Sequence, residues 1–296
     1  MIVVTTPTGQ IGREVVARLL DAPAAAAPVR VIVRDPARLD PQVRDRVEVV
    51  RGSHADPAVL KEACEGADRV FWLVPPDPAA DSVEGQYRVF NESLCEVIGA
   101  QGITRVVAVS TLGRGVARNA GLISVGLAMD EAIAATGVHY RALCPPALME
   151  NTLRQAAAIR DTGVLVTPHL PGRVLRLCAT RDIGAAAARL LLDDSWTGRA
   201  DVPLVSPDDL TPEGMAAVLA EVLDRPVRAE FVTVAAQQAA ILRSGATEAW
   251  AQGYADMIDA QNDQGFYGAV QLPTPDLAPT GFRQWCEEVL RPAVPA

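Results

Sequence analysis

The residues best suited to chemistry in this sequence form a short motif near the N-terminus. They are Thr6, Pro7, Thr8, Gly9, Gln10, Ile11 and Gly12. The motif follows an apolar run at 2–5 and precedes a helical pattern. In that setting, backbone N–H groups and the positive end of a helix dipole face a pyrophosphate. The motif therefore predicts a dinucleotide site, although Thr6 replaces the first glycine of the usual fingerprint. An ordinary strand-to-helix turn is the alternative interpretation.

A second motif indicates which dinucleotide binds. The next apolar run, 29–33, ends in Arg34, Asp35 and, one helical turn on, Arg38. Two guanidinium groups suit a ribose 2′-phosphate, which they bind through forked, charge-assisted hydrogen bonds. We therefore predict NADP(H) as the cofactor. A carboxylate at this place binds the 2′-hydroxyl of NAD, so Asp35 leaves NAD open, and a solvated arginine pair is the third alternative.

Two further strand ends contribute candidate site residues. Val74, Pro75 and Pro76 end the fourth predicted strand, where we expect the backbone to follow the adenosine side of the cofactor. Ser110 and Thr111 end the fifth strand, and we expect them near the nicotinamide as the candidate catalytic residues. Their hydroxyls have an alternative role in capping a helix or a turn.

The elements that must position these residues alternate along the first half of the chain. Short β-branched runs and helical patterns follow one another, which is typical of a doubly wound parallel sheet of the Rossmann type. After residue 150 the alternation ends, and the patterns predict a smaller α/β domain. We expect a cofactor domain at 1–150, with parts of 175–205 added to it, and a substrate or cap domain at 151–296.

The predicted C-terminal domain supplies candidates for a substrate site. Aromatic residues make up only 4% of the chain, yet several gather between 250 and 267. Tyr254, Met257 and Phe266 are suited to covering a flat apolar substrate, and Asn151 follows the sixth predicted strand. A helix packed into a core is the alternative for the first three, and a helix cap for Asn151.

Composition excludes several classes of function. The net charge is −9, which argues against a nucleic-acid partner. Three scattered histidines and five cysteines without C-x-x-C spacing predict no metal site and no disulfide. The sequence has no apolar stretch long enough for a membrane span and no leader pattern. We expect a cytoplasmic monomer or homodimer that acts on a small molecule.

The order of these motifs resembles the NmrA-like family of atypical short-chain dehydrogenase/reductases. The matching segments are T-G-Q-I-G at 8–12, V-R-D-P-A-R-L at 33–39, V-P-P at 74–76, V-S-T-L-G at 109–113, P-P-A-L-M-E-N at 145–151, R-D-I-G at 181–184, P-D-D-L-T at 207–211 and F-R-Q-W at 282–285. The resemblance implies NADP-preferring binding to the N-terminal sheet and a substrate cleft facing a small C-terminal domain. The family includes reductases, tailoring enzymes and redox-sensing regulators. Ser53 and His54 stand where the family often has an aspartate near the adenine. Ile123 and Leu127 are apolar where reductase members tend to be polar.

The positions of the tyrosine and lysine residues exclude one mechanism. Standard short-chain reductases use Tyr-x-x-x-Lys, in which the lysine activates the tyrosine as the proton donor. The only lysine is Lys61, and no tyrosine precedes it by four residues. We therefore predict an NADPH-dependent oxidoreductase without that pair, which reduces a quinone, an enone or a similar apolar molecule. A non-catalytic NADP(H) sensor is one alternative, and an epimerase or cyclase that uses bound cofactor is another.

Overall fold

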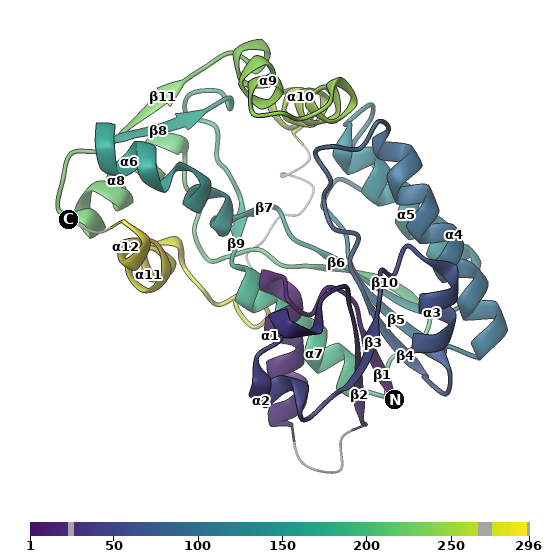
Figure 1. Cartoon of the computed structure of the whole chain (residues 1–296). Coiled ribbons are helices and arrows are strands. Elements are labelled where there is room, and N and C mark those ends of the chain that lie inside the picture. The colour runs from purple at the N-terminus through teal and green to yellow at the C-terminus, as the bar shows by residue number, and fades with distance from the viewer. Residues whose placement is uncertain (23–26, 266–273, 295–296) are drawn as a thin grey trace.

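A parallel sheet of seven strands forms the centre of the computed structural model, which describes residues 1–22, 27–265 and 274–294 (Figure 1). The order across the sheet is β3-β2-β1-β4-β5-β6-β10. The strands are β1 (Ile2–Val4), β2 (Val29–Val33), β3 (Glu48–Arg51), β4 (Arg69–Trp72), β5 (Arg105–Val109), β6 (His139–Cys144) and β10 (Arg199–Pro203). The order reverses at β1, and such a switch point is where open α/β sheets bind ligands.

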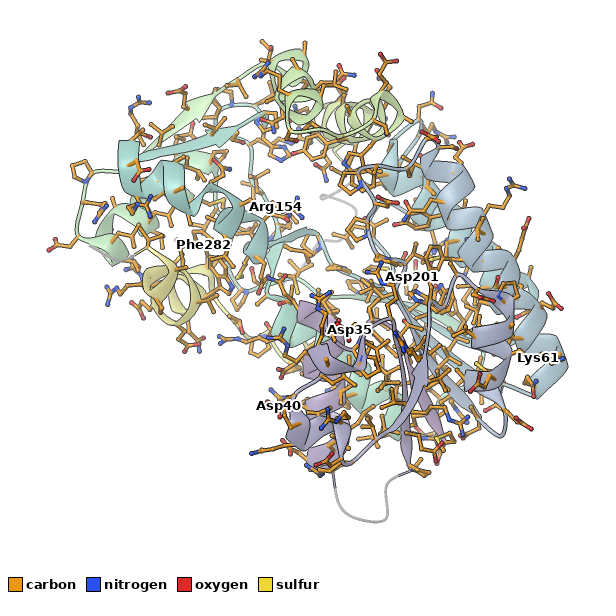
Figure 2. All side chains as sticks on the ribbon, in the orientation of Figure 1. Asp35, Asp40, Lys61, Arg154, Asp201 and Phe282 are labelled. Carbon is orange, nitrogen blue, oxygen red and sulfur yellow. The ribbon has the colours of Figure 1, made fainter. Side chains whose placement is uncertain are left out.

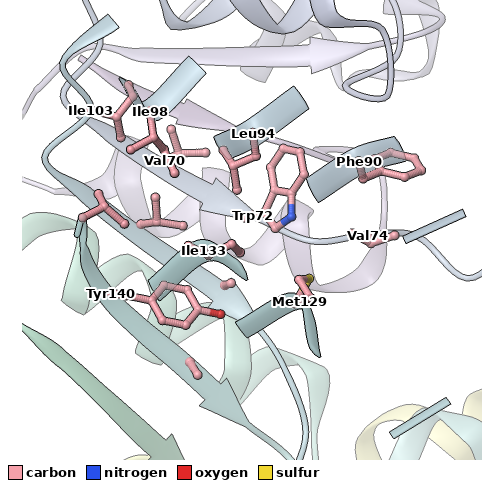
Figure 3. Close-up of a cluster of buried hydrophobic side chains, with 14 of the residues drawn as sticks. Val70, Trp72, Val74, Phe90, Leu94, Ile98, Ile103, Met129, Ile133 and Tyr140 are labelled. Carbon is pink, nitrogen blue, oxygen red and sulfur yellow. The ribbon is translucent and has the colours of Figure 1, made fainter. Parts of the chain in front are cut away.

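Helices cover both faces of this sheet because its strands are apolar on both sides. One face carries α1 (Gln10–Asp21) and α7 (Thr180–Leu192), and the other carries α3 (Pro57–Cys64), α4 (Val83–Gln101) and α5 (Leu122–Ala135). Successive residues of β4 show the alternation, since Phe71 packs with the first pair and Trp72 with the second group. Figure 3 shows Trp72 beside Phe90 and Leu94 of α4. The turns η1 (Pro36–Arg38) and α2 (Pro41–Arg44) follow β2.

The C-terminal elements gather in a second lobe, on the left of Figure 1. The chain leaves β6 through β7 (Ala147–Leu148), which pairs with β9 (Leu177–Cys178). The lobe contains η2 (Met149–Gln155), α6 (Ala156–Thr162), β8 (Val164–Thr167), α8 (Pro212–Leu223), β11 (Arg228–Phe231), α11 (Phe282–Trp285), the π-helical turn η3 (Cys286–Leu290) and α12 (Arg291–Ala293). Its core centres on Phe282 and Trp285, whose rings stack at 5.8 Å. The helices α9 (Val234–Arg243) and α10 (Glu248–Asp263) lie between this lobe and the upper ends of α4 and α5 (Figure 1).

The predicted α/β doubly wound sheet is confirmed, with one strand more than the sequence indicated. The missed strand, β10, lies at the edge and contains Arg199, Asp201 and Pro203, so it lacks the apolar run of a central strand. The chain returns from the second lobe to the sheet through α7 and β10, within the range 175–205. The domain boundary at residue 150 stays a prediction. In the described part of the chain, no helix has the length and apolar character needed to cross a bilayer.

Candidate active site

The turn after β1 has the close backbone contacts of a phosphate-binding loop. Thr6 adopts the left-handed conformation, with φ at 51°, and its carbonyl accepts a hydrogen bond of 3.0 Å from the Gly9 amide. A Cβ on Gly12 would stand 2.1 Å from the Thr6 oxygen. Only glycine therefore allows α1 to start this close to the turn. Thr6 fills the usual glycine position by accepting a left-handed backbone, which is unfavourable for a β-branched residue.

The start of α1 suits an anion. Gly9 caps the helix without a side chain, and the first turn has no acidic residue. The first backbone N–H groups of a helix have no partner within it, and their partial positive charge attracts phosphate. These residues therefore fit the pyrophosphate of a dinucleotide.

The side chains after β2 differ in whether they are available to bind the cofactor ribose. Asp35 accepts a hydrogen bond of 3.1 Å from the Ala37 amide and so caps the short turn η1. Arg34 and Arg38 are exposed, and neither forms an ion pair with any residue that the structure describes. The carboxylate is thus engaged in local structure, while both guanidinium groups are available to a ligand.

His54 is buried beside this edge. Its Nε2 lies 3.0 Å from the Leu73 carbonyl oxygen, and its ring packs edge-on against Trp72 and tilted against Phe90. Burial lowers the pKa of His54 to about 4, the hydrogen bond to Leu73 opposes this, and the charge of Arg34 adds to the lowering. His54 is therefore a neutral packing residue near neutral pH.

The predicted loop after β4 lies between that strand and α4. Val74 is buried, and the Pro75 carbonyl accepts a hydrogen bond of 2.7 Å from Gln86 of α4. At the same edge, Thr5 Oγ1 accepts a bond of 3.1 Å from the Leu73 amide. These contacts fix the backbone around Pro75 and Pro76 at the carboxyl end of the sheet.

Ser110 ends β5 with its hydroxyl directed toward α5. Its Oγ donates to Asp130 Oδ2 at 2.5 Å, and its amide donates to the Leu143 carbonyl at 2.7 Å. The neighbouring Thr111 presents its methyl group to Gly126 of α5, where an added Cβ would lie 3.5 Å away. When Asp130 is ionised, the Ser110 hydroxyl therefore gives its hydrogen to that carboxylate and keeps oxygen lone pairs to accept from a ligand.

Asp130 is the centre of a buried polar network. Its side chain is fully buried and accepts from Ser110, from the Tyr140 hydroxyl at 2.5 Å and from Arg114 at 2.5 Å. Burial raises the pKa of the Asp130 carboxyl, and the bonds from Ser110 and Tyr140 and the charge of Arg114 oppose that rise. Burial, followed by the charge of Asp130, holds the pKa of Tyr140 well above its usual value.

The Asp130 cluster extends to the surface through charged residues. We use this name for Ser110, Arg114, Asp130, Glu131, Tyr140, Arg199 and Asp201. Arg114 joins Asp130 to Asp201, with 2.6 Å between Nε and Oδ2, and also contacts Glu131. Arg199 pairs with the outer side of Glu131 at 2.6 Å. The cluster is thus buried at Asp130 and open to water at Glu131.

The predicted substrate residues come from both lobes. Asn151 is exposed on η2, while Tyr254 and Met257 lie on α10. Arg154, also on η2, extends toward the space between the lobes (Figure 2). Burial raises the pKa of Tyr254, and the charge of Arg154 opposes the rise. Phe266 lies outside the described residues.

A wide hollow of about 1070 Å³ lies elsewhere, between α4, α5 and α10. Tyr87, Asn91, Met129 and Gly253 are among its lining residues, whereas the turn at 6–12 and Ser110 are not. The chemistry of the strand ends therefore identifies the candidate active site, and the size of this hollow does not.

Comparison with known proteins assigns the family. Residues 7–169 match the model of a family described as NAD(P)H-binding. The chain belongs to this NAD(P)H-binding family. The matched segment contains the turn at 6–12 from Pro7 onward, the arginine pair after β2 and Ser110. It confirms the predicted class of cofactor and agrees with the NmrA-like resemblance, since the solved structure of an NmrA mutant has the same fold, with a TM-score of 0.68 at 15% identity.

Three proteins that are similar to this chain are named as reductases. A (4-alkanoyl-5-oxo-2,5-dihydrofuran-3-yl)methyl phosphate reductase of Streptomyces griseus is 34% identical over 82% of this chain and 80% of its own. An NAD(P)H azoreductase of Xenophilus azovorans is 29% identical over 89% and 85%. The structure of the Citrobacter sp. triphenylmethane reductase complexed with NADP(H) superposes with a TM-score of 0.80, at 20% identity and full coverage of both chains.

The sequence interpretation missed Asp130 and Arg154. Asp130 was detectable in principle, because it is an acid on the buried stripe of α5 formed by Ile123, Gly126 and Ile133. A carboxylate at such a position needs hydrogen-bonding partners. Nothing in the sequence names Tyr140 and Arg114 as those partners, since strand and loop geometry bring them together.

Proposed function

We propose that this NAD(P)H-binding protein is an NADPH-dependent reductase of conjugated carbonyl compounds or quinones. The observation that carries the proposal is at the end of β2, where Asp35 caps η1 while Arg34 and Arg38 remain available for a 2′-phosphate. Bound NADPH would supply a hydride. The turn at 6–12 would hold the pyrophosphate, and Ser110 and Thr111 would lie beside the nicotinamide, a placement that the strand order supports.

The absence of a Tyr-x-x-x-Lys pair favours particular acceptors. No tyrosine in the sequence is followed by lysine at the fourth position. Quinones and enones give stabilised anions after hydride addition, so they need less acid catalysis than simple ketones. The name of the Streptomyces griseus relative denotes an unsaturated furanone, which is an acceptor of this conjugated kind.

Arg154 narrows the acceptor further. A guanidinium group directed toward the space between the lobes, with its charge acting on the half-buried Tyr254, suits a molecule with a flat apolar body and an anionic substituent. The Streptomyces griseus relative is named for a phosphate ester of an unsaturated lactone. We infer a phosphorylated or carboxylated enone as the preferred class of substrate, with Asn151, Tyr254 and Met257 around it.

The test is NADPH oxidation, followed by absorbance, with a butenolide phosphate, its dephosphorylated alcohol, a naphthoquinone and an azo dye. We expect turnover with at least one conjugated acceptor and a lower KM for the phosphate than for the alcohol. The apolar Ile123 and Leu127 instead favour a sensor, which would bind NADPH and NADP⁺ unequally and reduce nothing in the panel. That result would replace the reductase with the sensor.

A further inference from the structure

The Asp130 cluster contains more acid than base. Its charged side chains are three carboxylates, from Asp130, Glu131 and Asp201, and two guanidinium groups, from Arg114 and Arg199. Ionised throughout, the cluster has one negative charge in excess. A proton on one carboxylate removes that excess.

Burial decides which carboxylate takes the proton. Asp130 has no exposed side-chain surface, whereas the side chains of Asp201 and Glu131 are 30% and 61% exposed. Water stabilises the two outer charges, and an uncompensated charge in the interior is far more costly. The remaining titratable neighbours are Tyr87 of α4 and Cys144 of β6, and the charge of Asp130 raises the pKa of both. Tyr87 and Cys144 are neutral near neutral pH, so neither adds a positive charge to that of Arg114 beside Asp130.

The hydrogen bond to Ser110 connects this proton to the reaction site. Ser110 Oγ lies 2.5 Å from Asp130 Oδ2. With Asp130 ionised, the serine hydrogen points inward and Ser110 offers only acceptor lone pairs. With Asp130 protonated, the carboxyl donates to Oγ, and the serine hydrogen turns outward to a ligand. The protonation state of Asp130 thus sets whether Ser110 accepts or donates.

We propose that Asp130 is a positioning residue that stores the proton for reduction and delivers it through Ser110. The proposal rests on the reductase function inferred above. It gives this chain an internal acid in place of the tyrosine and lysine that the sequence lacks. Ser110 is the group that touches the acceptor, and Asp130 acts only through it.

The transfer is balanced in atoms and charge. Hydride addition leaves the acceptor as an enolate or a quinol anion. The Ser110 Oγ–H bond breaks and its proton joins the acceptor oxygen, while the Asp130 O–H bond breaks and its proton joins Ser110 Oγ. Asp130 remains as a carboxylate, stabilised by Tyr140 and Arg114. After the product leaves, solvent water returns a proton to Asp130 through the hydroxyl of Ser110, which is partly exposed.

The first experiment tests, without turnover, whether Asp130 is protonated. Infrared difference spectra between the wild-type protein and Asp130→Asn, at neutral pH and without cofactor, should show the carbonyl band of a protonated carboxylic acid in the wild type. A carboxylate band in its place overturns the proposal. If Asp130→Asn does not fold, the wild type is compared with Ser110→Ala instead. The carbonyl band of the Asp130 carboxylic acid should then shift in frequency, because its hydroxyl partner has been removed. An unshifted band overturns the link to Ser110.

The second experiment tests whether the proton of Asp130 is used during reduction. With NADPH and a naphthoquinone, wild-type kcat should fall as pH rises through the Asp130 pKa, because the protonated form is the active one. Asp130→Asn should lower kcat at least tenfold, leave KM within about twofold and remove that pH dependence. Asp182→Asn is the matched control, because Asp182 is another buried aspartate but contacts Thr280 instead of the site. An unchanged profile in Asp130→Asn overturns the proton role alone, whereas no turnover by the wild type with any acceptor of the panel overturns the reductase function and the proton role together.

Discussion

Gly12 lies so close to the carbonyl of Thr6 that a Cβ at position 12 would stand 2.1 Å from that oxygen. Gly12→Ala should therefore displace the turn, lower the melting temperature and abolish NADPH binding in calorimetry. Gly9→Ala is the matched variant, because its Cβ would make an ordinary contact of 3.4 Å with the same oxygen. It should keep the melting temperature and weaken NADPH, since only the approach of the phosphate is obstructed. Equal NADPH affinity in Gly12→Ala and the wild type would contradict a phosphate site at this turn.

Arg34 offers a direct test of cofactor choice. Removing one charged hydrogen-bonding partner of a phosphate costs about 1.5–3 kcal/mol, so Arg34→Ala should weaken NADPH roughly ten- to a hundredfold and leave NADH within about twofold. Arg38→Ala should act in the same direction. Arg44→Ala, which removes an equal charge from α2, is the control and should change neither affinity. A parallel loss for NADPH and NADH in Arg34→Ala would show that this side chain does not read the 2′-phosphate.

The sheet was predictable, and the turn at 6–12 could be proposed as the cofactor site, because both depend on local patterns. The β-branched run at 2–5 and the small residues at 6–12 specify a strand and a turn from short-range preferences alone. Position 34 followed for the same reason, since it is the residue at which an apolar run ends. The edge strand β10 was not predicted, because it is a strand through its pairing with β6 and has no apolar run.

The interior of the site could not be read in this way. Ser110 was predicted at its strand end, but the direction of its hydroxyl depends on Asp130, which lies one helix away in α5. Tyr140 meets that carboxylate only because β6 lies beside β5 in register. Such contacts join residues on different elements, and they leave no periodic pattern in a single sequence from which they could be predicted.

Tyr140 should contribute measurably to stability through its bond to Asp130. Tyr140→Phe removes a buried donor from a buried carboxyl group, which costs about 1–3 kcal/mol. Tyr87→Phe is the control, because the Tyr87 hydroxyl makes no hydrogen bond to any residue that the structure describes. Urea unfolding of both variants measures the difference in the free energy of unfolding. Equal losses would mean that the Tyr140–Asp130 bond adds nothing to the fold.

His54 should make stability depend on pH in acid. Its pKa is about 4 in the folded protein and roughly 6.5 in an unfolded chain. Between these values the unfolded chain binds more protons, so the free energy of unfolding should fall as the pH falls from 6.5 toward 4. His54→Leu should be less sensitive over that interval. The measurement is the urea midpoint of both proteins over this pH interval. Parallel curves for the wild type and the variant would contradict the burial of a neutral ring.

Arg154 should decide how the enzyme distinguishes charged from uncharged acceptors. The guanidinium is directed toward the space between the lobes and its charge acts on Tyr254, so Arg154→Ala should raise KM for a butenolide phosphate at least tenfold, as expected for the loss of one charge-assisted contact. The dephosphorylated alcohol should be reduced equally well by the variant and the wild type, because it offers no anion. Arg160→Ala, on the exposed side of α6 and paired with Asp161, is the control for net charge. Equal losses for the phosphate and the alcohol would place Arg154 outside the recognition of the anionic group and assign it to the shape of the site.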